Sequence, residues 1–221
     1  MKILITGANG LLGSHAVQHF AAAHEVHALV RSAISEPVPG VTYHLIDLAQ
    51  DHALKTLPSQ VDAVLHLAQS ARFRDFPNQA LDVFDVNVGS TARLLDYARS
   101  SQASTFVLAS SGGVYGAGEE AFKENASIPQ HGLLGYYLAS KLCAEVLAQN
   151  YASLLNVSVL RFFFIYGKGQ KRSMLIPRLV DNIKAGLPIT LQGRDGIRIN
   201  PIHVSDAVQA LEGCLKLEGS H

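Results

Sequence analysis

A chain of 221 residues, of which 48% are hydrophobic, can bury a sizeable core, and its length suits one large domain or one domain with a small appendage. The formal net charge is zero and no run of Lys or Arg stands out, which argues against nucleic acid or an anionic membrane as a partner. The two cysteines, Cys143 and Cys214, lie far apart in helical patterns, so we expect two buried thiols and neither a disulfide framework nor a metal site.

The N-terminal residues run directly into a strand pattern and a glycine loop, without the architecture of a signal peptide. No apolar stretch is long enough to cross a bilayer. We therefore expect a cytoplasmic protein that has no membrane partner.

Short apolar runs bounded by turn residues alternate with helical patterns along most of the chain. The runs that predict buried strands cover residues 2–5, 25–30, 41–46, 61–67, 105–109 and 157–163. The clearest helical patterns cover residues 11–23, 80–99 and 136–154. This alternation predicts an α/β fold, a doubly wound parallel Rossmann sheet with helices on both faces and right-handed crossovers.

The C-terminal part of the chain has a different pattern. A Gly/Lys-rich stretch over residues 166–173 is typical of a hinge, so we assign residues 1–165 to the Rossmann domain and residues 166–221 to a small lobe. In this lobe we expect a helix over 174–185, a short strand at 189–191 and a helix over 205–216. Because ligands of doubly wound sheets sit at the carboxyl ends of the strands, we expect substrate contacts from this lobe.

A glycine-rich segment follows the first strand pattern at once and opens the first helix. Its spacing, G-x-x-G-x-x-G, suits a tight turn at Gly7, close approach of a pyrophosphate at Gly10, and close helix packing at Gly13. The helix N-terminus offers free N–H groups and a positive dipole to phosphates. We therefore expect a dinucleotide to bind at Gly7, Asn9, Gly10, Leu11, Leu12 and Gly13.

The ends of the second and third predicted strands bear on the kind of dinucleotide. NAD enzymes often place an acid after the second strand to hold the ribose hydroxyls, and this chain has Arg31 there. Arg31 can pair with a 2′-phosphate, which favours NADP over NAD, although an exposed arginine without a ligand explains it equally well. Asp47 and Leu48 end the third strand, where the adenine edge would lie, and Asp47 is equally suited to cap a following helix.

A tyrosine and a lysine share one face of a predicted helix. Four residues advance a helix by about 400°, which places Tyr137 and Lys141 one turn apart on the same side. An adjacent ammonium and a positively charged nicotinamide would stabilise the phenolate of Tyr137, which would make it a usable proton acceptor or donor. Tyr136 points elsewhere, and we interpret it as a packing residue or a substrate contact.

A serine at the end of a central strand could complete this group. The strand over 105–109 runs into Ser110, Ser111 and two glycines, which leave the backbone accessible. A serine there can hydrogen-bond a reacting hydroxyl or carbonyl beside the tyrosine, although Ser and Gly also dominate ordinary turns.

Together these motifs resemble the extended short-chain dehydrogenase/reductase family, most closely its NAD(P)-dependent sugar epimerase/dehydratase branch. The matching segments are the glycine loop, His66-Leu67-Ala68, residues 87–91, residues 110–116, Tyr137-x-x-x-Lys141 and residues 160–167. The resemblance implies that Tyr137 is the acid/base, that Lys141 lowers its pKa and holds the nicotinamide ribose, and that Ser111, with Ser110 as second choice, binds the reacting oxygen. It further implies cofactor contacts from Leu67, Ala68, Gln69, Asn87 and Phe164.

The same resemblance implies an NAD(P)-dependent epimerase that acts on a nucleotide sugar through a transient keto intermediate. A reductase of a sugar or another small carbonyl compound, or a non-catalytic NADP-binding sensor, stays open as an alternative. Dehydration is disfavoured, because Ser111-Gly112-Gly113 stands where family dehydratases have Thr-Asp-Glu. Family members continue beyond the motif near His203, so we expect an incomplete C-terminal substrate lobe. The apolar helical patterns over 80–99 and 136–154 would suit a homodimer contact.

Overall fold

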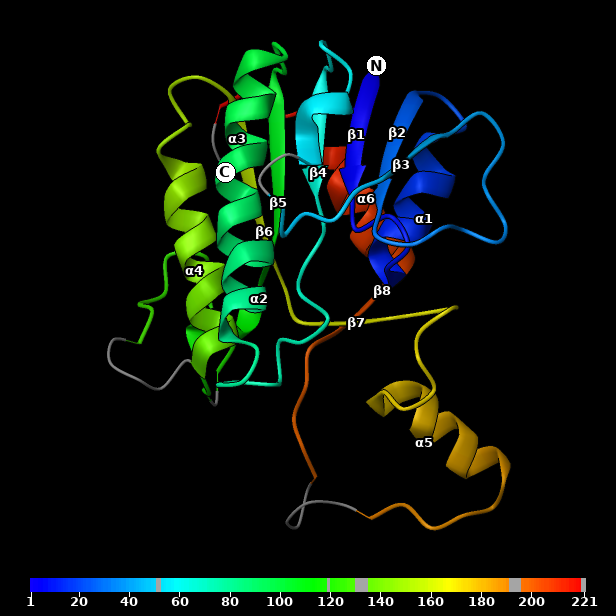
Figure 1. Ribbon diagram of the computed structural model, residues 1–221. Helices are drawn as coiled ribbons and strands as arrows, with labels where there is room; N and C mark the ends of the chain where they lie inside the picture. The colour runs from blue at the N-terminus through cyan, green and yellow to red at the C-terminus, as the bar shows by residue number, and fades with distance from the viewer. Residues whose placement is uncertain (51–52, 119, 130–134, 191–195, 220–221) are drawn as a thin grey trace.

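The computed structural model describes residues 1–50, 53–118, 120–129, 135–190 and 196–219 (Figure 1). Six strands form one parallel sheet in the order β3-β2-β1-β4-β5-β6. In chain order they are β1 (Lys2–Thr6), β2 (Glu25–Val30), β3 (Thr42–Leu45), β4 (Ala63–His66), β5 (Thr105–Ser111) and β6 (Asn156–Phe162). This order, which reverses direction beside β1, confirms the predicted doubly wound Rossmann sheet.

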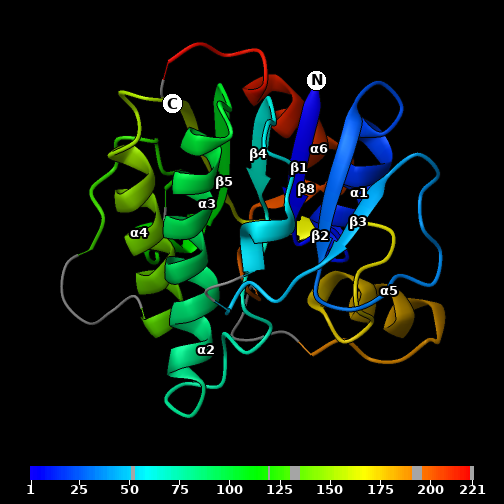
Figure 2. The ribbon, with the colours of Figure 1, turned by 45° about the horizontal axis from the view of Figure 1, so that its top comes forward.

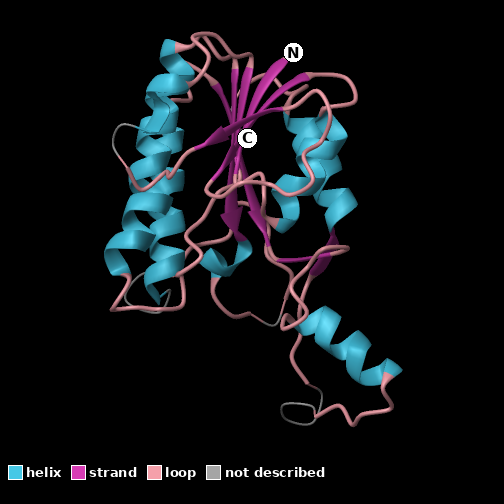
Figure 3. Cartoon of the chain, turned by 45° about the vertical axis from the view of Figure 1, so that its right-hand side comes forward, coloured by secondary structure: helices cyan, strands magenta, loops and turns pink. Residues whose placement is uncertain are grey.

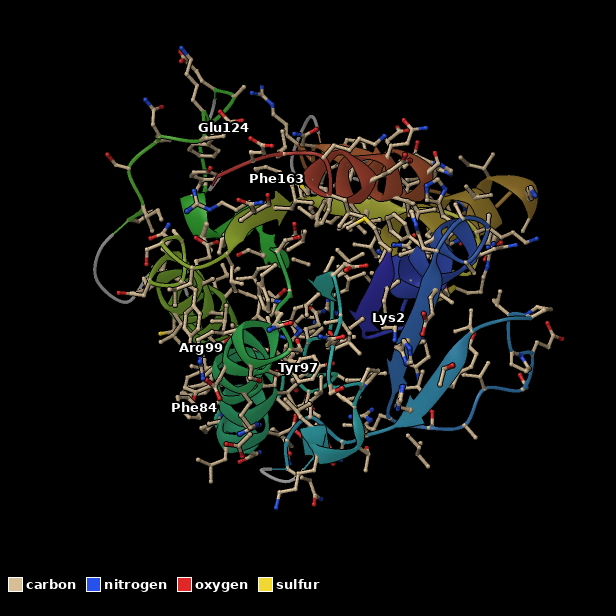
Figure 4. All side chains as sticks on the ribbon, turned by 90° about the horizontal axis from the view of Figure 1, so that it is seen from above. Lys2, Phe84, Tyr97, Arg99, Glu124 and Phe163 are labelled. Atoms are coloured by element: carbon tan, nitrogen blue, oxygen red, sulfur yellow. The ribbon has the colours of Figure 1, made fainter. Side chains whose placement is uncertain are left out.

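Helices cover both faces of the sheet, because the strands carry apolar side chains on both sides. On β1, Ile3 and Ile5 pack toward α1 (Leu11–Phe20) and α6 (Val204–Cys214), while Leu4 packs toward the other face. That other face is covered by α3 (Ser90–Ser100) and α4 (Gly135–Gln149). The view along the strands shows the sheet between its two helical layers (Figure 4). The core is therefore two apolar layers separated by the sheet.

The helix predicted over residues 80–99 consists of three segments. α2 (Ala80–Phe84) passes into a π-helical turn, Asp85–Gly89, which continues as α3. Within this turn Asn87 is buried, and its side chain bonds Ser70 N at 2.9 Å and Ser140 Oγ at 2.8 Å. π-Helical turns are frequent at functional sites, and this one points Asn87 at the helix that carries Tyr137.

The segment after β6 differs from the predicted lobe in two respects. β7 (Phe164–Tyr166) pairs in parallel with β8 (Pro201–His203). Ile189 and Thr190, from the strand predicted at 189–191, are not in a strand, and Leu191 lies outside the described residues. Of the helices in the described ranges, α5 (Leu175–Lys184) is the one that stands away from the sheet, beyond the carboxyl ends of the strands (Figures 1 and 3).

The helix predicted over 205–216 was wrongly assigned to that lobe. α6 packs into the same core as α1, with Val204, Ala207, Val208 and Leu211 buried. A hydrogen bond of 2.9 Å joins His19 Nε2 on α1 to Glu212 Oε2 on α6. The apolar side of α6 therefore completes the layer over β1 and β2, and Figure 2 shows it beside α1.

Two further expectations concern the cysteines and membrane spans. Cys214 is buried as expected, but Cys143 is exposed on α4, so the expectation of two buried thiols was wrong. Cys143 lies on the solvent side of α4, away from the buried Lys141 and Ala144. Within the described ranges, no helix is long and apolar enough to cross a membrane.

Candidate active site

The glycine loop has no room for side chains at two of its positions. Gly7 has φ +67°, and a Cβ there would lie 2.8 Å from the backbone of Ala68. A Cβ on Gly13 would lie 2.1 Å from the carbonyl oxygen of Gly7. Gly10, at the N-terminus of α1, provides no side-chain cap. The first N–H groups of α1 are thus left for an anion, which fits the pyrophosphate of a dinucleotide.

One cavity, of about 360 Å³, opens on the β2 side of the glycine loop. Arg31, at the end of β2, and Asp47 and Leu48, after β3, line it. Asp47 Oδ1 accepts a hydrogen bond of 3.0 Å from Ala49 N, so its carboxylate stabilises a turn rather than an α-helix. The other predicted cofactor residues in its wall are Gly7, Asn9, Gly10, Leu67, Ala68 and Gln69.

A second cavity, of about 280 Å³, lies on the β5 side of the same loop. Ser111, Tyr137 and Lys141 all line it, so the structure brings together the three residues predicted from separate segments. Gly7, Gly10, Leu67 and Gln69 line both cavities, and Leu11, Leu12 and Gly13 line the second. The glycine loop thus borders both cavities, and Ser111, Tyr137 and Lys141 line the second.

The hydroxyl of Tyr137 donates a hydrogen bond of 2.7 Å to Gln69 Oε1. The Phe73 ring lies against the Tyr137 ring at a centroid distance of 4.9 Å. Burial raises the pKa of Tyr137 to about 12, and Ser111 acts in the opposite direction. Burial therefore outweighs the effect of Ser111, and the lowering expected from Lys141 stays a prediction. Neighbouring Tyr136 stacks on Phe76, which assigns it to packing.

Lys141 is buried, and its Nζ donates to the carbonyl oxygen of Ala109 at 3.0 Å. Burial lowers the pKa of Lys141 to about 8, an effect that the carboxylate of Glu145 partly offsets.

The two serines at the end of β5, Ser110 and Ser111, differ in their hydrogen-bond partners. Both line the second cavity, but Ser110 is buried and donates to Glu145, whereas Ser111 is partly exposed and its Oγ accepts from Gly113 N at 3.2 Å. Ser111 is therefore the serine placed to meet a substrate.

Sequence reasoning missed the buried carboxylate of Glu145, which is 1% exposed on its side chain. Its Oε2 lies 2.7 Å from Nη2 of Arg161, and Arg161 Nε donates to both of its oxygens. Arg161 also donates to the hydroxyl of Tyr115 at 2.8 Å. A usable signal was present, because Glu145 follows Lys141 by four residues and so lies on the face of α4 that carries Tyr137.

A buried histidine positions the strand end that faces the glycine loop. Thr6 Oγ1 accepts from the N–H groups of Leu67 and Ala68, both at 3.1 Å, so its own hydrogen points to His66 Nδ1 at 2.8 Å. His66 Nε2 then donates to Thr91 Oγ1 at 3.0 Å, and Thr91 donates to a backbone carbonyl. The network requires a neutral His66, and burial lowers its pKa to about 3.

Two predicted cofactor residues, Asn87 and Phe164, lie outside the walls of both cavities. Asn87 accepts from Ser70 N and donates to Ser140 Oγ, and the bond to Ser70 supports the loop that carries Gln69. Phe164 is on β7 and 43% exposed, whereas its neighbour Phe163 lines the cavity that holds Tyr137 and Lys141. Phe163 also lines a cavity of about 500 Å³ beside β6 that includes Glu124 (Figure 4). Phe163 lies between the end of β6 and the start of β7, and it is 40% exposed although it lines these cavities.

Residues 3–217 match the sequence model of one protein family, the NAD dependent epimerase/dehydratase family. The chain belongs to this family. This confirms the resemblance drawn from the glycine loop, the strand-end serine and the Tyr137–Lys141 spacing, and it makes the protein an NAD(P)-dependent enzyme of the extended short-chain dehydrogenase/reductase type.

Characterised and uncharacterised members of the epimerase/dehydratase family are similar along most of the chain. An uncharacterised UDP-glucose epimerase, YtcB of Bacillus subtilis (strain 168), is 29% identical over 97% of this chain and 72% of its own length. GDP-6-deoxy-D-mannose reductase of Pseudomonas aeruginosa is 33% identical over 84% of this chain and 60% of its own length.

Solved structures of family members share the fold. MoeE5 in complex with UDP-glucose and NAD has a TM-score of 0.79 and 31% identity, and the match covers all of this chain and 74% of MoeE5. UDP-glucose 4-epimerase of Thermus thermophilus in complex with NAD has a TM-score of 0.82 and 26% identity, and the match covers all of this chain and 76% of the epimerase. The Rossmann arrangement of this chain is therefore that of NAD-binding members of the family.

Proposed function

We propose that this enzyme is an epimerase that acts on a nucleotide sugar through a transient keto intermediate. The observation that carries the proposal is the convergence of Ser111, Tyr137 and Lys141 on the cavity beside the glycine loop. Relatives and structural neighbours whose names state UDP-sugar epimerase activity support the same substrate class. An enzyme that both oxidises and reduces one carbon needs one group that takes and returns a proton, and Tyr137 is the candidate.

The mechanism assigns a separate task to each of these side chains. Ser111 holds the reacting oxygen of the sugar beside the Tyr137 hydroxyl. Tyr137 takes the hydroxyl proton when the carbon is oxidised to the ketone and returns it when the ketone is reduced. Lys141 places a buried cation one helical turn from Tyr137, which favours the phenolate. When bound, the oxidised nicotinamide supplies a hydride acceptor and a positive charge that also favours the phenolate.

The cofactor is proposed to occupy both cavities, with its pyrophosphate at the N-terminus of α1. The adenosine half would lie in the cavity that Arg31, Asp47 and Leu48 line, and the nicotinamide half in the cavity of Tyr137 and Lys141. We propose a preference for NADP, because Arg31 follows β2 and the guanidinium could pair with a 2′-phosphate.

A second candidate function is reduction of a sugar or another small carbonyl compound. The Tyr137 hydroxyl already donates to Gln69 Oε1, which is the protonation state that a reductase needs at the start of its reaction. The 33% identity to a GDP-6-deoxy-D-mannose reductase favours it as well. A non-catalytic NADP sensor is the weakest of the alternatives, since a sensor needs none of Ser111, Tyr137 and Lys141.

We also propose a homodimer and a cytoplasmic location. Leu81 and Phe84 on α2 and Val146 on α4 are large apolar residues that are 76%, 48% and 52% exposed. They lie on the two helical segments that the sequence suggested for a dimer contact. Sedimentation of the purified chain would test it, and a monomer at all concentrations would contradict it.

The proposed function is tested by titrating the purified protein with NADPH and NADH while following fluorescence, and then assaying a panel of nucleotide sugars. Conversion of one sugar to its epimer, without net consumption of cofactor, is the expected result. Stoichiometric consumption of NADPH with a keto substrate would establish the reductase instead. Binding without any turnover would favour a sensor, and the absence of binding would overturn the assignment of the glycine loop.

A further inference from the structure

Gln69 lies where the cofactor and catalytic cavities meet. It follows β4 on the loop that Asn87 holds through Ser70, and it lines both cavities. Its amide oxygen accepts the hydrogen bond from the Tyr137 hydroxyl at 2.7 Å. Ser111 Oγ, which accepts from Gly113 N, also acts on the Tyr137 hydroxyl and lowers its pKa, whereas Lys141 Nζ donates to the carbonyl of Ala109.

An amide oxygen can only accept, so in this arrangement it stabilises the neutral phenol against the phenolate. The Phe73 ring, 4.9 Å from that of Tyr137, covers the phenol on one side and limits its access to water. Gln69 itself is exposed, and its amide oxygen is the acceptor that fixes the direction of the hydroxyl hydrogen.

We propose that Gln69 is a positioning residue for the proton of Tyr137, which it holds on the phenol so that the site starts as a proton donor. The inference rests on the proposed function, because it assumes that Tyr137 is the acid/base, and it adds that reduction of a carbonyl is the favoured half-reaction. Carboxamide chemistry suits this task, since the amide oxygen accepts from a phenol and, held in this orientation, presents no N–H to a phenolate.

The reduction balances with NAD(P)H as the hydride donor and one proton from solvent. Bound NAD(P)H would supply a hydride to the carbonyl carbon, and Tyr137 donates its proton to the carbonyl oxygen, which gives an alcohol, NAD(P)⁺ and a phenolate. The O–H bond of Tyr137 breaks, so Gln69 Oε1 loses the hydrogen that it accepted. Solvent then returns a proton to the phenolate, which restores the hydrogen bond to Gln69 Oε1.

The test measures the titration of Tyr137 itself and does not require turnover. All tyrosines are replaced by 3-fluorotyrosine, whose phenol is more acidic, and the ¹⁹F resonance of residue 137 is assigned by its loss in Tyr137→Phe. The pH midpoint of the Tyr137 titration should fall by about 1 pH unit in Gln69→Ala, because one hydrogen bond to the neutral phenol is lost. In Gln69→Glu it should rise, because a carboxylate repels the phenolate. Gln60→Ala, which removes an exposed glutamine paired with Gln102, is the matched control and should leave the midpoint unchanged.

An unchanged midpoint in both Gln69 variants, or a rise in Gln69→Ala, would overturn the inference. Gln69→Ala and Gln69→Glu test it in opposite directions, so a general loosening of the site cannot produce the expected pair of results. If the midpoints move as expected but no nucleotide sugar is converted, the proposed function fails while the inference about Gln69 stands. If nucleotide sugars are converted but the titration midpoints of Tyr137 do not move, the inference about Gln69 fails while the proposed function stands.

Discussion

Arg161 on β6 and Glu145 on α4 form a bidentate ion pair, with Glu145 buried and Nη2 2.7 Å from Oε2. Glu145 also accepts from Ser110, which precedes Ser111. The pair thus ties the helix of Tyr137 and Lys141 to the strand of Ser111. Charge pairing with Glu145 raises the pKa of Arg161 further above its usual range.

Arg161→Ala should lower the free energy of unfolding by about 3–5 kcal/mol, because it leaves the carboxylate of Glu145 buried without the guanidinium that balances its charge. Urea unfolding followed by circular dichroism measures this change. Arg99→Ala is the matched control, since Arg99 pairs with Asp96 on the exposed side of α3 and should matter little. Equal losses in the two variants would show that burial of the pair is unimportant.

Gly13→Ala should abolish dinucleotide binding and destabilise the fold, because the new Cβ would lie 2.1 Å from the carbonyl oxygen of Gly7. Fluorescence titration with NADPH and thermal unfolding measure the two effects. Gly213→Ala provides the control, since nothing lies within 4 Å of a Cβ at that helical position. It should leave binding intact and stabilise α6 by about 0.5–1 kcal/mol. Normal NADPH affinity in Gly13→Ala would contradict the assigned packing role.

Tyr137→Phe should lower kcat by about 100- to 10,000-fold while leaving cofactor affinity nearly unchanged, because it removes the transferred proton and keeps the ring. Steady-state kinetics and NADPH titration separate the two quantities. Tyr97→Phe serves as the control. Tyr97, which is labelled in Figure 4, lies on α3, and its hydroxyl donates a hydrogen bond to the carbonyl oxygen of Pro58. Unchanged turnover in Tyr137→Phe would remove this residue from the mechanism.

Stability should fall as the pH drops below about 6.5, because His66 is held neutral in the fold. Its pKa is about 3 when folded and 6.5 when unfolded, so between these values only the unfolded chain binds the proton. From pH 6.5 to pH 5 this linkage amounts to about 2 kcal/mol. Urea unfolding across this range should show a weaker pH dependence in His66→Gln. An identical slope in both proteins would mean that His66 is protonated in the fold.

Arg31→Asp should shift the preference from NADP toward NAD, because a carboxylate repels a 2′-phosphate and can accept from ribose hydroxyls. The ratio of the two dissociation constants measures the shift. Arg178→Asp makes the same charge change on α5, away from the cavity that Arg31 lines, and should leave the ratio unaltered. A ratio that stays constant in Arg31→Asp would make Arg31 an ordinary surface residue.

The sequence alone determined the features that depend on local spacing. Apolar runs between turn residues located all six strands of the sheet, and their alternation with helices determined its parallel topology. The glycine loop and the four-residue spacing of Tyr137 and Lys141 were readable because backbone sterics and helical periodicity act over a few residues.

The tertiary structure alone decided which distant side chains meet. Gln69 reaches the Tyr137 hydroxyl across 68 positions of sequence, and Arg161 reaches Glu145 across 16. The docking of α6 on α1 and the choice of Ser111 over Ser110 also depend on which face of each element is buried. Local patterns cannot supply this information, because burial and hydrogen-bond partners are set by the packing of elements that are remote in the chain.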